Sequence, residues 1–376
     1  MLPMNIEPMK LHGQREETTM NHLEQELHYP LQERIPEAGQ TIEIVPGILW
    51  IRMGLPFALN HINLWLIEDD YQTDQGPVHG WTVVDCGINS DATRDAWEVL
   101  FGSHLRGLPI VRVIATHCHP DHVGLADWLC SRWKAPLFMS TGEYAFARMM
   151  SAGLPGVDGS AMFPHFRKHG LVTAEMQEKI QERKTYYTRL VPTVPTAYHR
   201  LQEGQSLKIG RHEWRVITGF GHSPEHVSLH CTALNCLISG DMVLPRISTN
   251  VSVFAAEPEA NPVLQYLESL KKYADLPEQV LVLPSHGKPF TGIHTRIRQL
   301  HEHHRERLNE VLQACGTPQS ANDIVPMMFK RPLDAHQLTF ALGEALAHCH
   351  YLWLEGKLKR ELGSDDVYRF VAAINE

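Results

Sequence analysis

The feature that most constrains this chain is a histidine-rich stretch that directly follows an apolar run. Residues 110–115 are β-branched or apolar apart from one arginine, which is typical of a buried strand. Residues 116–122 then read Thr-His-Cys-His-Pro-Asp-His, so three imidazoles and one carboxylate fall within six residues. Burying these titratable groups without partners would be costly. We therefore interpret the stretch as a ligand-binding turn at a strand end, with a solvent-exposed polar loop as the alternative.

Alternation within the extended part of this stretch predicts two ligand positions. His117 and His119 fall on the same side, where both can bind one ion. Asp121 and His122 begin the following turn and face a second position. Cys118 points away from both and is expected to pack. The chain has 24 histidines, against 10 tyrosines and 12 phenylalanines, and neutral imidazole is a common ligand of transition metals.

Three further side chains of the ligand type follow apolar runs later in the chain. His222 comes after the run at 212–218, Asp241 after the run at 236–239, and His286 after the run at 280–283. Glycine, serine or proline beside each one permits a tight turn. Because strand ends of an α/β sheet converge on one edge, we expect these side chains to meet the residues of the histidine-rich stretch.

The pattern of apolar residues predicts a layered α/β domain. Short β-branched runs alternate with segments of helical spacing, and a second set of strands and helices mirrors the first. We expect strands at 41–45, 48–53, 62–68, 81–85, 110–115, 136–139, 212–218, 227–231, 236–239 and 280–283, and helices at 92–105, 123–133, 262–273 and from 290 to 312.

Three segments stand apart from this alternation. Residues 1–40 are polar and are expected to be an extension, whose first 35 residues can be removed without loss of metal or activity. The main domain spans 41–312 and carries an insertion or lid at 141–199, with a helix at 172–190. Residues 313–376 form a small helical, winged-helix-like domain, with helices at 321–329 and 335–354 and strands at 356–361 and 367–370.

Composition narrows the functional classes. There is no apolar stretch of membrane-spanning length and no secretory signal at the start, so we expect no membrane association and a cytoplasmic protein. The 43 acidic residues exceed the 34 basic ones, giving a net charge of −9, which makes nucleic acid an unfavoured partner. Seven scattered cysteines without a Cys-x-x-Cys pair are interpreted as reduced thiols.

The motifs together resemble one family. His-x-His-x-Asp-His at 117–122, Gly-His-Ser-Pro-x-His at 221–226, Ser-Gly-Asp at 239–241 and Ser-His-Gly at 285–287 are similar, in type and order, to those of the metallo-β-lactamase-fold hydrolase superfamily. The resemblance covers residues 42–305 and implies an αββα sandwich. The tail resembles the winged-helix-like domain attached to a subset of these hydrolases.

This resemblance implies a site with two divalent metal ions, most commonly zinc, with iron or manganese as an alternative at one position. It assigns His117, His119 and His222 to the first ion, Asp121, His122 and His286 to the second, and Asp241 to both. The catalytic residues would be Asp121, which orients a metal-bridging hydroxide, and Asp241. Asp85 and His226 would support the ligands without binding metal.

The resemblance also favours one reaction class. True β-lactamases of the superfamily carry Cys or Ser at the position of Asp241, and the flavodiiron relatives carry a carboxylate at that of His119. We therefore expect a glyoxalase II-like thioesterase (hydroxyacylglutathione hydrolase-like) that cleaves a small-molecule thioester, ester or lactone. The alternatives are a metal-dependent ribonuclease or phosphodiesterase, and a metal-stabilised binding or regulatory protein. The substrate-binding residues and a homodimeric state stay open.

Aromatic and sulfur-containing side chains gather in the insertion and suggest two interpretations. They could wall an apolar substrate pocket, or they could be ordinary core residues. Similarly, the loop 57–61 could reach the metals or form a plain hairpin. In the insertion the side chains are Tyr144, Phe146, Met149, Met150, Phe163, Phe166, Tyr186 and Tyr187. In the loop they are Phe57, Asn60 and His61.

Overall fold

Two sheets that face each other form the centre of the structure, a computed structural model that describes residues 22–173 and 185–373. The first sheet contains seven strands in chain order, antiparallel from β1 to β4 and parallel from β4 to β7. Its strands are β1 (Ile42–Val45), β2 (Ile48–Gly54), β3 (His61–Thr73), β4 (Gly76–Val84), β5 (Ile110–Ile114), β6 (Leu137–Met139) and β7 (His199–Arg200).

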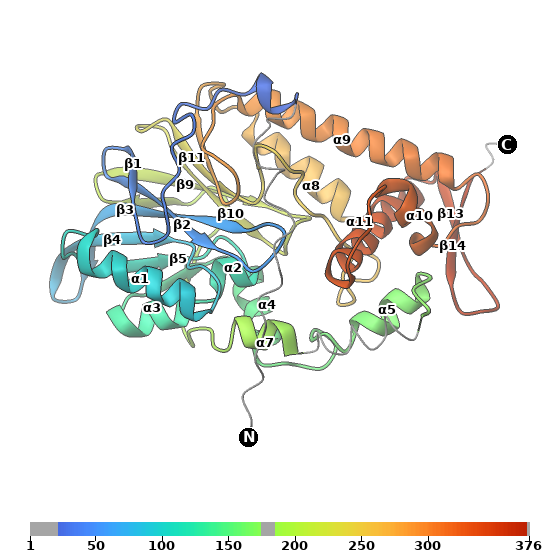
Figure 1. Cartoon of the computed structure of the whole chain (residues 1–376), viewed down its shortest axis with the longest axis horizontal. Helices are drawn as coiled ribbons and strands as arrows, with labels where there is room; N and C mark the ends of the chain where they lie inside the picture. The colour runs from blue at the N-terminus through green and yellow to red at the C-terminus, as the bar shows by residue number, and fades with distance from the viewer. Residues whose placement is uncertain (1–21, 174–184, 374–376) are drawn as a thin grey trace.

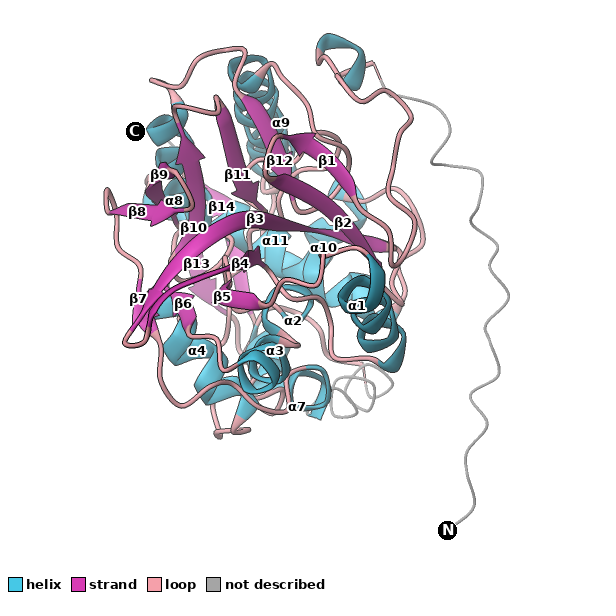
Figure 2. Ribbon diagram, turned by 90° about the vertical axis from the view of Figure 1, so that its left-hand side faces the viewer, coloured by secondary structure: helices cyan, strands magenta, loops and turns pink. Residues whose placement is uncertain are grey.

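The second sheet contains five strands in the order β12-β11-β10-β9-β8, with β11 and β12 parallel and the other pairs antiparallel. Its strands are β8 (Ser206–Ile209), β9 (His212–Gly219), β10 (His226–Cys231), β11 (Cys236–Gly240) and β12 (Leu281–Pro284). Helices lie on the outer side of each sheet, as Figure 2 shows. The molecule is thus a four-layer αββα sandwich, as the sequence predicted.

Three hydrophobic clusters fill the three interfaces between these layers. In β2, for example, Trp50 points into the cluster between the sheets, whereas Ile51 points into the cluster under the helices of the first sheet. The strands are buried on both faces because helices cover the outer ones. This explains why their sequences read as continuous apolar runs rather than as an alternating pattern.

Capping residues mark where several of the helices begin. Ser90 begins α1 by accepting a hydrogen bond from the backbone amide of Thr93, and Ser320 and Asp334 begin two later helices with complete capping boxes. The longer helices are α1 (Asp91–Ser103), α3 (Ala126–Trp133), α4 (Thr141–Ser151), α8 (Pro262–Leu270), α9 (Ile293–Ala314), α10 (Ala321–Met328) and α11 (Ala335–Leu354). The shorter ones are η1 (Glu24–Glu26), α2 (Pro120–Val123), α5 (Met162–Lys168), α7 (Tyr186–Leu190) and η3 (Lys271–Tyr273).

Most of the predicted elements are present with shifted ends. The strand predicted at 62–68 continues to Thr73 as β3, and the short strands β7 and β8 were not predicted. The insertion at 141–199 begins directly with α4. Much of the helix predicted at 172–190 lies outside the described residues, and α7 forms its last part.

Part of the predicted N-terminal extension belongs to the fold. Leu27 and Tyr29 are 7% and 8% exposed and join the core between the second sheet and its helices. His28 forms a β-bridge with Thr291, and the Tyr29 ring lies 6.4 Å from that of Phe290. Part of the segment expected to be an extension therefore packs into the core, and the effect of its removal on metal content and activity stays a prediction.

The C-terminal part packs against α8 and α9, which cover the second sheet. It consists of α10, α11 and the hairpin β13 (Leu358–Leu362) and β14 (Tyr368–Ala372), and α9 leads to it (Figure 1). Its side chains share one hydrophobic cluster with α8 and α9, and residues 341–350 of α11 are almost all buried. Among the described residues, no helix is both long and apolar enough to cross a membrane.

Candidate metal centre

Seven side chains of the ligand type meet at the ends of strands from both sheets. They form two groups, each with ligand atoms within 4.8 Å of one another. His117, His119, Asp121 and His122 follow β5 of the first sheet, whereas His222, Asp241 and His286 follow β9, β11 and β12 of the second. The first group contains His117, His119, His222 and Asp241, and the second contains Asp121, His122 and His286.

The first group points three imidazole nitrogens at one position. His117 Nε2 lies 2.9 Å from His119 Nδ1 and 3.2 Å from His222 Nε2, and Asp241 Oδ2 lies 3.3 Å from His222 Nε2. Burial, together with the neighbouring imidazoles, lowers the pKa of His117 and His119 well below the ordinary value. Both rings are therefore neutral at physiological pH, which is the state that binds a metal ion.

The second group places the Asp121 carboxylate against two imidazoles, and Asp241 of the first group faces the same two rings. Asp121 Oδ2 lies 3.6 Å from His122 Nε2 and 3.5 Å from His286 Nε2. The other oxygen of Asp241, Oδ1, lies 3.7 Å and 3.5 Å from the same two nitrogens. Asp241 thus faces the first group with one oxygen and the second group with the other, as a residue shared by both would.

The donor atoms of this centre fit a cation. His122 Nε2 and Asp241 Oδ1 are buried and find no hydrogen-bond partner among the described residues. Burial opposes a charge on His122, but Asp121, Asp85 and Asp241 together raise its pKa to about 10. Burial likewise opposes a charge on Asp241, yet His286 and His122 hold its pKa well below the ordinary value. The centre therefore favours positive charge, which divalent metal ions would supply.

Asp85 bonds both a histidine of the second group and the backbone of the ligand loop. Its Oδ2 accepts a hydrogen bond from His122 Nδ1 at 2.8 Å, and its Oδ1 accepts one from the Thr116 backbone amide at 2.8 Å. These bonds leave His122 Nε2 as the atom that faces the centre. Asp85 has a φ of 64°, which is uncommon for a residue with a side chain, and this turn brings its carboxylate under the ligand loop.

His226 acts on the shared carboxylate through the backbone. Its Nε2 accepts a hydrogen bond from the backbone amide of Asp241 at 3.1 Å. Gly240 makes this contact possible, because a Cβ there would lie 2.3 Å from His226 Nε2. His226 therefore bonds the backbone of Asp241 and belongs to neither ligand group.

The His286 loop is held by residues of β2 and β3. His286 Nδ1 donates to the backbone oxygen of His61, and the amide of Gly287 donates to His61 Nε2, at 2.8 and 2.9 Å. Arg52 and Asn63 both donate to the backbone oxygen of Gly287. His61 therefore holds the His286 loop through its backbone oxygen and its ring, and it belongs to neither ligand group.

Glu143 is a supporting residue that the sequence did not reveal. Its buried carboxylate accepts hydrogen bonds from the backbone amides of Cys118 and Glu225 and from the hydroxyl of Ser223. It thus ties the loop of His117 and His119 to the loop of His222. The pattern Ser-x-x-Glu at 140–143 predicts a capping box, in which the Glu143 carboxylate accepts a hydrogen bond from the backbone amide of Ser140. In the structure this carboxylate bonds the two ligand loops instead.

A second residue of the insertion, Tyr187, also contacts the loop of the first ligand group. The Tyr187 hydroxyl, from α7, donates to the backbone oxygen of Cys118 at 2.6 Å. Cys118 itself is 1% exposed and packs in the core of the first layer, as expected. Glu143 accepts a hydrogen bond from the backbone amide of Cys118. The insertion therefore binds both the amide and the backbone oxygen of the residue that joins His117 to His119.

Several aromatic residues of the insertion have structural roles. The ring of Tyr144 stacks on that of Tyr198 at 3.9 Å, and its hydroxyl donates to the Pro195 backbone. Phe166 is 4% exposed within the core. The ring of Tyr186 contacts that of Phe57 at 6.4 Å, which joins the insertion to the loop before β3. For Tyr144 and Phe166 the core interpretation thus holds.

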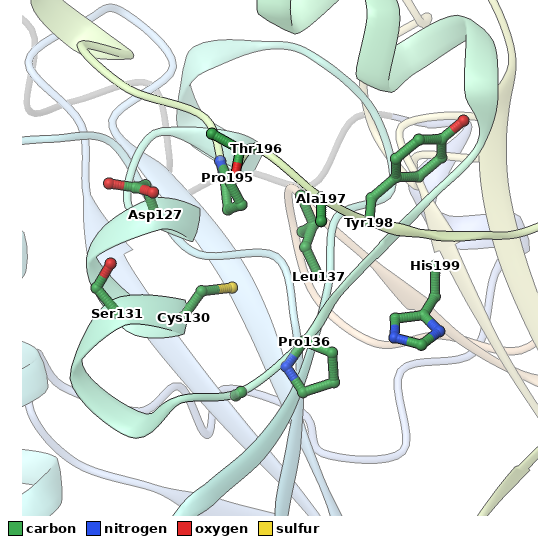
Figure 3. Close-up of a pocket in the computed structure, with 11 residues that line it drawn as sticks. Asp127, Cys130, Ser131, Pro136, Leu137, Pro195, Thr196, Ala197, Tyr198 and His199 are labelled. Carbon is green, nitrogen blue, oxygen red and sulfur yellow. The ribbon is translucent and has the colours of Figure 1, made fainter.

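A separate hollow lies beside α3 and the start of β6. It has a volume of about 350 Å³, and Figure 3 shows Cys130 and Ser131 on one side and Pro195 to Tyr198 on the other. None of its lining residues belongs to the two ligand groups. Burial raises the pKa of Cys130 to about 12, so this thiol is protonated and unreactive.

Four αββα layers, with histidines and aspartates from both sheets at one edge, define the class of metal-dependent hydrolases with a metallo-β-lactamase fold. The chain belongs to the metallo-β-lactamase superfamily, whose family model matches residues 61–286. A second model, the metallo-β-lactamase-like C-terminal domain, matches residues 308–373. The chain is accordingly a metal-dependent hydrolase of this superfamily.

Similar proteins come from several bacteria. The chain is 54% identical to a β-lactamase domain protein from Burkholderia ambifaria, with a TM-score of 0.88 over 94% of this chain and 100% of that one. It is 27% identical to the metallo-β-lactamase family protein TTHA1429 from Thermus thermophilus, with a TM-score of 0.73 over 88% and 100%. It is also 22% identical to the probable metallo-hydrolase YqjP of Bacillus subtilis, over 85% of this chain and 97% of that protein.

Proposed function

We propose that this protein hydrolyses the carbonyl group of a thioester, ester or lactone, in the manner of a hydroxyacylglutathione hydrolase. The two ligand groups would hold two zinc ions, with iron or manganese as the alternative at one of them. Such ions supply a hydroxide nucleophile at neutral pH and polarise the carbonyl that it attacks. The substrate would be a small molecule.

The observation that carries this proposal is the position of the Asp241 carboxylate. Its Oδ2 lies 3.3 Å from His222 Nε2, and its Oδ1 lies 3.5 Å from His286 Nε2. A carboxylate that faces both groups suits two ions held close together, as hydrolysis by a shared hydroxide requires. The β-lactamases that the chain resembles use Cys or Ser at this position, so we do not propose that activity.

The remaining side chains have distinct roles in this scheme. His117, His119 and His222 would hold the first ion, and His122 and His286 the second. Asp121 has a side chain that is 18% exposed, whereas that of His122 is fully buried. A partly exposed carboxylate at the edge of the centre suits a residue that accepts a proton from the attacking water and orients it. We therefore assign this role to Asp121.

The C-terminal part offers little support for cleavage of RNA. In a winged helix that binds nucleic acid, one helix must enter a groove, but α11 is buried against α8, α9 and α10. Arg360 and Arg369 are engaged with Glu259 and Asp365, at 3.0 and 2.7 Å. We therefore favour a packing role for this domain and a small-molecule substrate.

The decisive experiment is hydrolysis of a glutathione thioester by zinc-loaded protein, with the chelator-treated protein as the blank. We expect turnover that depends on metal. If the loaded protein binds two ions per chain but cleaves no thioester, ester or lactone, the proposal is wrong. A protein that unfolds without metal and has no turnover on any of these would instead be a metal-stabilised binding or regulatory protein.

We also propose a cytoplasmic location. Its support is that all seven cysteines are free and buried in the structure, which suits a reducing compartment. Mass spectrometry of the protein alkylated directly after cell lysis would test this. We expect seven reduced thiols, and a disulfide in freshly lysed cells would contradict the proposal.

A further inference from the structure

The C-terminal helix α11 reaches the first ligand group through one loop. This loop follows β11 and contains Asn250, whose backbone oxygen accepts a hydrogen bond from His222 Nδ1 at 2.8 Å. The bond fixes the ring so that Nε2 faces His117 and Asp241. The orientation of His222 therefore depends on where the backbone of Asn250 lies.

The side chain of Asn250 is held at both of its polar ends. Ser252 Oγ donates to its Oδ1 at 2.8 Å. The carboxylate of Glu344, on α11, faces Asn250 closely enough for the Asn250 side chain to favour its ionised form. Because one neighbour comes from the loop and the other from the C-terminal helix, the peptide at Asn250 is fixed relative to both.

The helix lies unusually close to this loop. A Cβ on Gly343 would lie 2.7 Å from Ser252 Oγ, and the Val253 amide donates to the backbone oxygen of Gly343. Glu344 is held in turn, since its backbone oxygen accepts a hydrogen bond from His348 Nδ1 at 2.7 Å. The carboxylate is thus presented to Asn250 by a backbone with little freedom to move.

We propose that Glu344 is a positioning residue for the first metal site, acting on His222 through Asn250. The C-terminal domain would then set the affinity of one of the two metal sites, although it contributes no ligand. This is the behaviour of hydrogen-bond partners behind metal ligands, whose loss typically weakens metal binding by about 10- to 100-fold. The inference concerns metal affinity and does not depend on which carbonyl compound is hydrolysed.

The test measures zinc affinity separately at each site of the full-length protein, by competition with a chromophoric chelator. A His286→Ala background leaves the first site to report, and a His119→Ala background leaves the second. Glu344→Ala is expected to weaken zinc binding about tenfold or more in the first background and to change it less than about twofold in the second. Glu355→Ala, at the exposed end of the same helix, is the control and should change neither.

Two further variants separate positioning from general packing. In Glu344→Gln the amide oxygen can still accept the hydrogen bond from Asn250, so zinc affinity should return to nearly the original value. Asn250→Ala breaks the same bond without altering α11 and should reproduce the loss at the first site. Adding Glu344→Ala to Asn250→Ala should then have no further effect.

The proposal would be overturned by any of three results. Zinc affinity at the first site could be unchanged in both Glu344→Ala and Asn250→Ala. The loss could be equal at both sites, which would indicate a general loosening of the fold. Or the effect of Glu344→Ala could persist in the Asn250→Ala background, which would show that it does not pass through Asn250.

Discussion

The carboxylate of Glu143 accepts a hydrogen bond from the backbone amide of Cys118, 2.8 Å away. This amide lies between two histidines of the first ligand group, and the same carboxylate also holds Ser223 and the amide of Glu225. One buried side chain therefore sets the spacing between the His117 loop and the His222 loop.

Replacing Glu143 by alanine is expected to lower both stability and metal content. The change leaves three buried donors without an acceptor, so the free energy of unfolding should fall by about 2–4 kcal/mol. Denaturant unfolding and metal analysis would measure both effects. Glu98→Ala is the matched control, because Glu98 is exposed and its ion pair within the described part of the chain is with Arg132 at the surface. Its loss should cost about 0.5 kcal/mol or less. Equal effects of the two variants would contradict the role given to Glu143.

Replacing Asp121 by alanine is expected to abolish hydrolysis while the fold persists. The side chain lies at the edge of the centre and is 18% exposed, so its removal leaves little buried space. Turnover should fall by about 10²-fold or more because proton transfer and orientation of the attacking water are lost. Steady-state kinetics and thermal unfolding would be measured together. Full turnover in this variant, or in His119→Ala, would rule out the mechanism.

Replacing Gly240 by alanine is expected to disturb the backbone bond between Asp241 and His226. A Cβ there would lie 2.3 Å from His226 Nε2, and Gly240 has a φ of 54°. Gly204→Ala is the control, since its φ is 73° and no atom lies within 4 Å of its Cβ. We expect Gly240→Ala to be less stable than the control by about 2 kcal/mol or more, because only it adds a clash to the backbone strain. Similar urea midpoints for the two variants would show that the structure accommodates a Cβ at position 240 without a loss of stability.

Buried histidines are expected to make the protein sensitive to acid. His350 is fully buried, donates from Nδ1 to the backbone oxygen of Ala260, and has a pKa lowered by burial to about 4. The unfolded chain takes up a proton near pH 6.5 but the folded chain does not, so stability is complete above pH 6.5 and falls as the pH drops towards 4.

The variant His350→Asn tests whether stability falls with pH for this reason, because the asparagine amide can replace the Nδ1 donor but does not titrate. Relative to the wild type, the variant should gain about 3 kcal/mol in free energy of unfolding between pH 7 and pH 4. Urea titrations at several pH values would measure the difference. A constant difference across this range would mean that His350 is protonated as readily in the folded protein as in the unfolded one.

Shortening the N-terminus tests the role of Leu27 and Tyr29. A chain that begins at Pro36 loses both buried side chains, whereas one that begins at His22 keeps them. Because it loses this buried apolar surface, the chain that begins at Pro36 should have a free energy of unfolding lower by about 3 kcal/mol or more. Thermal unfolding of the two shortened chains, side by side, would measure it. Equal stability would restore the view that the whole segment is an extension.

The sequence predicted the ligand loops well because each one directly follows a strand. A strand with a clear apolar pattern fixes where its end lies, and the residue after it must lie at the sheet edge. This is why His222, Asp241 and His286 could be anticipated as neighbours although they come from separate parts of the chain. The supporting roles expected for Asp85 and His226 came instead from the resemblance of their motifs to the family.

The residues that the sequence did not reveal act through contacts between distant segments. Glu143 is 25 residues from Cys118, and Asn250 is 28 residues from His222. In both pairs one partner is a backbone atom, and any residue type can supply a backbone oxygen or amide, so no motif marks it. The burial of Leu27 was missed because Leu23, Leu27 and Leu31 stand among charged and polar residues and form no sustained apolar pattern.

The ligands of each group come from both sheets, and this has a consequence for how the centre forms. Neither half of the sandwich contains a complete set, so a chain with only one sheet assembled has no strong site for a cation. A metal ion bound here would therefore stabilise the arrangement in which the two halves are packed together. Its affinity becomes a measure of how well the halves fit, and a mutation far from the centre that shifts one sheet along the other would appear first as a change in metal content.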